Sequence, residues 1–148
     1  MEYIRMKKIF IIYILAQFVF AGENDSTGTI IFSVVDFRNN KGKLHASLFS
    51  AKDGFPGEFK KAHINKTIQI ENQKSRVVFE NIKYGEYAVG FLHDENLDDK
   101  LNTNWFGMPK EGIAVSNNAK DSFGPPDYSE AKFILKTDTL QQIIYIEY

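Results

Sequence analysis

The chain has 148 residues, no cysteine, 25% charged residues and a formal net charge of −1 at pH 7. A disulfide-stapled fold is therefore excluded, and the chain lacks the positive charge and the basic clusters that a nucleic-acid partner requires. This length suits one domain with a two-layer core, after a short N-terminal segment is set aside.

Residues 1–21 have the pattern of a secretory signal peptide. A basic start precedes the apolar run 9–20, which is shorter than the roughly eighteen residues that span a bilayer. The small side chain of Ala21 suits cleavage just before Gly22. We therefore expect export to the periplasm or the medium, with residues 22–28 as a flexible leader and no transmembrane anchor after cleavage; an uncleaved anchor is the alternative.

Short β-patterned segments make up most of residues 29–148, which we expect to form a single domain. Alternating or β-branched runs predict strands at 29–37, 43–49, 67–70, 76–79, 86–92, 132–135 and 142–148. The turn residues between the first two runs predict a hairpin. No convincing amphipathic helix separates the runs, so parallel pairing through helical crossovers is not expected. The sequence predicts an all-β domain: an antiparallel immunoglobulin-like or transthyretin-like sandwich of about seven strands with one long loop.

A turn glycine followed by a tyrosine marks the start of one predicted strand. Gly85 and Tyr87 have the spacing found in transthyretin-like and other immunoglobulin-type sandwiches, where a buried tyrosine donates its hydroxyl hydrogen to nearby backbone. No charged sequence neighbour would shift the pKa of Tyr87, so a structural role is favoured over acid–base chemistry.

The long loop, residues 93–131, begins with side chains that could bind a cation. Asp94, Asn96 and Asp98 occupy alternate positions, and Ca²⁺ prefers such oxygen ligands. The candidate ligands are Asp94, Asn96, Asp98, Lys100 through its backbone carbonyl, and Asn102. An EF-hand is excluded, because Asp99 and Trp105 stand where that loop has glycine and glutamate. An Asx-turn network without an ion is the alternative for these residues.

The same loop also supplies a candidate ligand-binding surface. Its aromatic rings could stack on a sugar or a peptide, and its polar groups could supply hydrogen bonds. The candidate residues are His93, Trp105, Glu111, Asn117, Asn118 and Tyr128. The alternative for the aromatic segment is structural: Trp105, Phe106 and Met108 would fold back onto the sandwich and keep the loop ordered.

No nucleophile, base and orienting partner occur in a recognisable order. We therefore expect an exported, non-enzymatic accessory or binding module of the cell envelope, a monomer whose partner is an unknown envelope protein, peptide or glycan. No cofactor is certain, and Ca²⁺ is the one candidate. The rival class is a hydrolytic enzyme that uses the cluster His93, Asp94, Glu95 and Glu111.

An ordered series of motifs resembles a known family. The motifs are HDEN at 93–96, KLNTN at 100–104, GMPKEG at 107–112, SNNA at 116–119 and FGPP at 123–126. Together they make residues 29–148 similar to DUF2141, a bacterial domain of unknown function. The resemblance implies an exported, β-rich domain without an established biochemical role. One departure matters: the family pattern commonly has glycines where this chain has Leu97 and Asp99, and glycine tolerates positive φ more readily.

Overall fold

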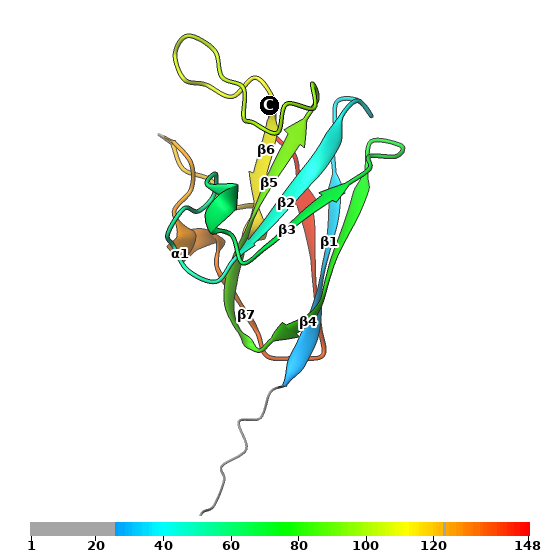
Figure 1. The fold of residues 1–148 in the computed structure, drawn as a ribbon, viewed down its shortest axis with the longest axis vertical. Coiled ribbons are helices and arrows are strands. Elements are labelled where there is room, and N and C mark those ends of the chain that lie inside the picture. The colour runs from blue at the N-terminus through cyan, green and yellow to red at the C-terminus, as the bar shows by residue number, and fades with distance from the viewer. Residues whose placement is uncertain (1–25, 123) are drawn as a thin grey trace, which may run out of the picture.

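The computed structural model describes residues 26–122 and 124–148, so the expected signal peptide and residues 22–25 lie outside the described residues. Two β-sheets pack face to face, and short helical segments lie beside one of them (Figure 1). The strands are β1 (Thr27–Val35), β2 (Lys43–Phe49), β3 (Ile64–Ile68), β4 (Ser75–Lys83), β5 (Gly85–Asp94), β6 (Gly112–Val115), β7 (Phe133–Leu135) and β8 (Thr139–Tyr145). The helical segments are η1 (Phe59–Lys61), η2 (Ser116–Asn118) and α1 (Tyr128–Ala131). Among the described residues, no helix has the length and apolar character needed to span a membrane.

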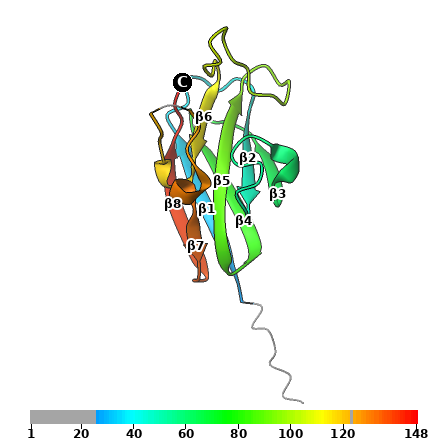
Figure 2. The same cartoon turned by 90° about the vertical axis from the view of Figure 1, so that its left-hand side faces the viewer.

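The three-stranded sheet has the order β4-β1-β8, and the five-stranded sheet has the order β3-β2-β5-β6, with β7 paired to the first residues of β5. Figure 2 shows the two layers from the side, with β8 and β1 in one and β5 and β6 in the other. All strand pairs are antiparallel except β1 with β8. This parallel pair needs no helical crossover, because most of the domain lies between the two strands in sequence.

The core forms between the two sheets because β1 and β2 alternate apolar and polar side chains. Ile30, Phe32 and Val34 of β1 are fully buried, and Leu44, Ala46 and Leu48 of β2 are fully buried in the same cluster. The ring of Phe32 meets Phe91 of β5 edge-on, with 5.1 Å between centroids. Each buried Ile, Phe, Val or Leu side chain stabilises the fold by about 1.5–3 kcal/mol.

Two expectations about the strands and the loop are wrong. The first two strands form no hairpin: β1 pairs with β4 and β8, whereas β2 pairs with β3 and β5. The connection runs from one sheet to the other instead, with Asp36 at φ 66° and Phe37 buried. The long loop is not continuous, because β6, η2 and α1 lie within it, and the strand count is eight.

β5 is the central strand of its sheet and is buried on both faces. Every residue from Tyr87 to Asp94 is buried. Pro56 covers the outer face so closely that a Cβ added at Gly90 would lie 2.6 Å from its carbonyl oxygen. The Tyr87 hydroxyl donates to the Lys83 carbonyl at 2.9 Å, which confirms the expected hydrogen bond to nearby backbone. The last residues of β5, His93 and Asp94, are therefore buried where the strand ends.

Candidate functional site

Asp94 ends β5 and organises the acidic loop, which we define as residues 94–102. The side chain is fully buried. Its Oδ1 accepts hydrogen bonds from the backbone N–H groups of Leu97 and Asp98, at 2.7 and 3.3 Å. Its Oδ2 accepts from the Asp99 N–H at 2.9 Å and contacts His45 Nε2 at 3.1 Å. A carboxylate has about four acceptor positions, so these four contacts use its capacity.

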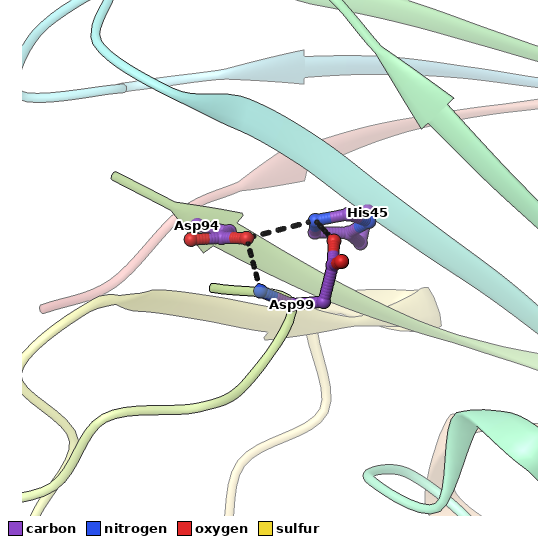
Figure 3. A group of neighbouring side chains, drawn as sticks. All are labelled: His45, Asp94 and Asp99. Atoms are coloured by element: carbon purple, nitrogen blue, oxygen red, sulfur yellow. Dashed lines mark hydrogen bonds and ion pairs between the residues drawn. The ribbon is translucent and has the colours of Figure 1, made fainter. Parts of the chain in front are cut away.

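His45 joins Asp94 from the neighbouring strand β2, as Figure 3 shows. Its Nε2 lies 3.5 Å from Asp99 Oδ1, and its Nδ1 lies 3.1 Å from Thr67 Oγ1. Because ionised carboxylates only accept hydrogen bonds, Nε2 carries a proton and donates to Asp94. Burial raises the pKa of Asp94, but the hydrogen bonds from Asp99, His45, Leu97 and Asp98 outweigh it, and the net pKa is lowered.

Glu111 fixes the other end of the acidic loop, just before β6. Its side chain is buried, and its two oxygens accept backbone hydrogen bonds from Glu95 at 3.1 Å and from Asn102 at 3.0 Å. Glu95 forms an ion pair with Arg38 and accepts a hydrogen bond from Asn39 at 2.9 Å. Glu111 therefore ties the start of the loop to its end.

The five candidate calcium ligands divide into two groups in the structure. Asn96, Asp98 and Asn102 contact one another: the Asn96 and Asn102 amides donate to Asp98 Oδ2 at 3.1 and 2.9 Å. The Lys100 backbone N–H donates to Asp98 Oδ1 at 2.9 Å. Asp94 does not join these side chains, because its oxygens bind backbone N–H groups and His45. The contacts have the pattern of the Asx-turn network.

His93 is buried at the end of β5 and bonded at both ring nitrogens. Nε2 lies 2.7 Å from the Lys41 carbonyl, so it carries the proton. Nδ1 lies 2.6 Å from the Tyr148 hydroxyl oxygen, which itself accepts the Arg38 N–H at 3.1 Å. These contacts link His93 to the Lys41 backbone and to the Tyr148 hydroxyl. The partners of this histidine are therefore a tyrosine hydroxyl and a backbone carbonyl.

The candidate ligand-binding residues do not share one surface. His93 and Glu111 are buried. Asn117 holds η2 in place: its amide nitrogen donates to the Ala131 and Lys132 carbonyls, and its amide oxygen accepts from Gln142. The Asn118 amide is bonded to the backbone of β8, at the Ile143 carbonyl and the Tyr145 N–H.

Tyr128 and Trp105 complete the set and differ in their exposure. Tyr128 is half-buried, and its ring meets Phe55 edge-on at 5.6 Å. Trp105 is fully exposed, Phe106 is 92% exposed and Met108 is 61% exposed. The expectation that this aromatic segment folds back onto the sandwich is therefore wrong. Only Trp105 of the six candidates presents its whole side chain to solvent.

The structure also contains a groove, which sequence reasoning did not find. It is an open cavity of about 240 Å³ beside β5 and β6. The lining residues are mostly apolar and include Pro56, Phe59, Leu92, Leu101, Ile113, Val115, Pro125, Pro126 and Tyr145. The charged residues in the lining are Lys120, Asp121 and Glu147, and Lys120 forms an ion pair with Glu147. The lining described contains no histidine, serine, threonine or cysteine.

Comparison with known proteins gives a family and no closer relative. The model of a family described as an uncharacterized protein conserved in bacteria, DUF2141, matches residues 32–143. No curated protein and no solved structure gave a significant match. The match runs from Phe32, within β1, to Ile143, within β8, and it includes the acidic loop and both of its carboxylate anchors. The chain therefore belongs to the DUF2141 family.

Proposed function

We propose that this protein is an exported, non-enzymatic binding module of the cell envelope, built on an immunoglobulin-like or transthyretin-like sandwich. Its binding site is the groove beside β5 and β6, and its ligand is an apolar peptide segment of an envelope protein. The groove carries this proposal, because an open, mostly apolar cavity with few polar groups is typical of a binding site. The signal-peptide pattern of residues 1–21 supports export.

The lining favours a peptide over a glycan. A sugar needs several hydrogen-bonding groups, but the Asn118 amide is already bonded to β8 and Lys120 is paired with Glu147. The prolines, Phe59 and Tyr145 instead offer rigid apolar contact to a side chain.

The contacts of the rival hydrolytic cluster favour structural roles. His93 is buried and bonded at both nitrogens, and Asp94 has no acceptor position to spare. Both oxygens of Glu111 hold backbone, and Glu95 is paired with Arg38. A general acid or base must reach a substrate, and each of these groups is engaged elsewhere.

Peptide selection and calorimetry test the proposal. Short peptides would be selected from a displayed library against the purified protein, and their Kd values measured for the wild type and three variants. Tyr145→Ala removes an aromatic lining residue and Gly57→Phe adds a ring at the lining, where a Cβ meets no atom within 4 Å. We expect each to weaken binding about tenfold or more, as for an aromatic contact of a binding hot spot.

Ile134→Ala is the matched control, because Ile134 is an exposed apolar residue on β7 that does not line the groove. Its Kd should equal that of the wild type. Failure to select any peptide, or equal weakening by Ile134→Ala, would contradict the assignment of the groove.

Export is tested separately by intact-mass measurement of the protein purified from its native host. The protein should begin at Gly22, and a species that retains Met1 would refute the proposed export.

A further inference from the structure

The segment between the acidic loop and β6 ends in an ordered turn, which we call the apolar tip (residues 103–109). Thr103 and Pro109 form an isolated β-bridge, and the Asn104 N–H donates to the Met108 carbonyl at 2.8 Å. The Asn104 side-chain oxygen accepts the N–H groups of Phe106 and Met108, at 2.9 and 3.0 Å. The Gly107 N–H donates to the Asn104 carbonyl at 3.0 Å. Many of the backbone hydrogen-bonding groups of the turn are therefore paired within the turn itself.

The apolar side chains of this tip point away from the protein. Trp105 is fully exposed and Phe106 is 92% exposed, and the loop that carries them stands clear of the sheets in Figure 1, between β5 and β6. Solvated apolar side chains of this size are costly, and their clustering marks a surface that is covered by a partner.

Area and backbone bonding favour a lipid bilayer as that partner. Two aromatic side chains bury about 300–500 Å² together, whereas a stable protein interface buries about 800 Å² on each partner. A bilayer accepts a small protrusion, but it requires that backbone groups be hydrogen-bonded within the inserted segment. The internal bonding of the apolar tip meets that requirement, and tryptophan is enriched at the membrane interface.

Charge next to the tip supports the same partner. Lys100 and Lys110 are exposed and flank the tip on both sides in sequence, and no acidic residue occurs between them. Asp99, directly before Lys100, is exposed, but its Oδ1 lies 3.5 Å from His45 Nε2. The next acidic residue after the tip, Glu111, is buried and bonded to backbone. Two lysines at the base of an apolar protrusion suit the phosphates of anionic lipid headgroups.

We propose that the apolar tip inserts Trp105, Phe106 and Met108 into the interfacial region of a bilayer that contains anionic lipid, with Lys100 and Lys110 at the headgroups. The tip residues lie outside the groove lining. The proposal therefore stands apart from the peptide-binding function, and either can fail alone.

Trp105 is the only tryptophan in the chain, so its fluorescence reports on the tip directly. The purified protein, as processed by its host, would be mixed with vesicles of phosphatidylethanolamine and phosphatidylglycerol at 3:1. We expect a blue shift of the emission and quenching by brominated lipid. Loss of each lysine charge, in Lys100→Gln or Lys110→Gln, should weaken vesicle binding about fivefold.

The double variant Phe106→Ser, Met108→Ser keeps the reporter and should abolish the shift, whereas Ile134→Ser, on β7, should leave it unchanged. Binding through residues 1–21 would survive the double variant and would overturn the proposal. An unchanged spectrum with vesicles would also overturn it. A concentration-dependent blue shift without lipid, lost in Gly57→Phe, would assign the tip to the groove of a second copy and refute the bilayer as its partner.

Discussion

Asp94 holds the acidic loop through bonds that a neutral side chain cannot replace. The change Asp94→Asn turns one acceptor oxygen into a donor that faces backbone N–H groups or His45. Since a buried donor left unsatisfied costs about 1–3 kcal/mol, we expect the free energy of unfolding to fall by at least about 2 kcal/mol. Urea denaturation measures it. Asp99→Asn is the control, because the Asp99 side chain is 85% exposed. Replacing its carboxylate by an amide should change the free energy of unfolding by less than about 0.5 kcal/mol.

The lowered pKa of Asp94 predicts how stability depends on acid. The folded state binds the proton more weakly than the unfolded chain, in which the pKa of this carboxyl lies near its ordinary value of 3.8. The contribution of Asp94 is therefore complete above that value and is lost as the pH falls through the folded-state pKa. Between pH 7 and pH 2, the free energy of unfolding should fall more steeply with decreasing pH in the wild type than in Asp94→Asn. Parallel pH profiles would show that other carboxylates account for the acid transition.

At the level of single residues, the sequence identified the important carboxylates but not their partners. Asp94 and Asp98 stand out by spacing, whereas His45 lies 49 residues before Asp94. The two meet because β2 pairs with β5 in a register that sets His45 opposite Leu92 and Lys43 opposite Asp94. Both strands were predicted, but their register was not. The contact between His45 and Asp94 therefore could not be predicted from the sequence.

The acidic loop keeps two non-glycine residues in the left-handed region. Leu97 has φ 61° and Asp99 has φ 58°, at the positions where the family resemblance implies glycine. Such a conformation costs a branched residue about 1–2 kcal/mol, and glycine loses about 0.5–1 kcal/mol more entropy on folding. Leu97→Gly should thus raise the unfolding free energy by about 0.5–1 kcal/mol. Leu101→Gly, at an exposed leucine without positive φ, should lower it; if both variants lower it, the strain argument is wrong.

The Asx-turn contacts also predict how the loop responds to calcium. The four hydrogen bonds to Asp94 leave no acceptor position for an ion, so thermal unfolding in EDTA and in millimolar calcium should superimpose. A bound ion at a hundred times its Kd would instead add about 2.7 kcal/mol. A calcium-dependent rise in Tm that Asp98→Asn removes would show that the loop rearranges around a metal.

The alternation of apolar residues was enough to predict seven of the eight strands, with shifted ends. β6 was missed because its four residues, Gly112–Val115, are too short to show a period inside a polar segment. The false hairpin arose because 38–42 has turn composition, which is equally suited to a connection between sheets. The exposure of Trp105 was missed because apolar side chains are expected to be buried in a core. The hydrogen bonds of Phe106 and Met108 to Asn104 order the tip without one.

At the level of the whole molecule, two surfaces carry the proposals: the groove for a peptide and the apolar tip for a bilayer. Leu101 lines the groove and directly precedes Asn102 and the tip in sequence. The buried anchors Asp94 and Glu111 fix the segment that connects them. The domain would then hold an envelope partner close to a membrane surface, which is consistent with an accessory role.

Site-specific photo-crosslinking in living cells of the native host tests the central claim most directly. A benzophenone amino acid would replace Tyr145 in the groove and, in a second strain, the exposed Ile134 of β7. The proposed function predicts a discrete protein crosslinked from position 145 and none from position 134, with mass spectrometry locating the crosslink in one apolar segment of that protein. No crosslink from position 145, or the same products from both positions, would contradict the groove as the binding site.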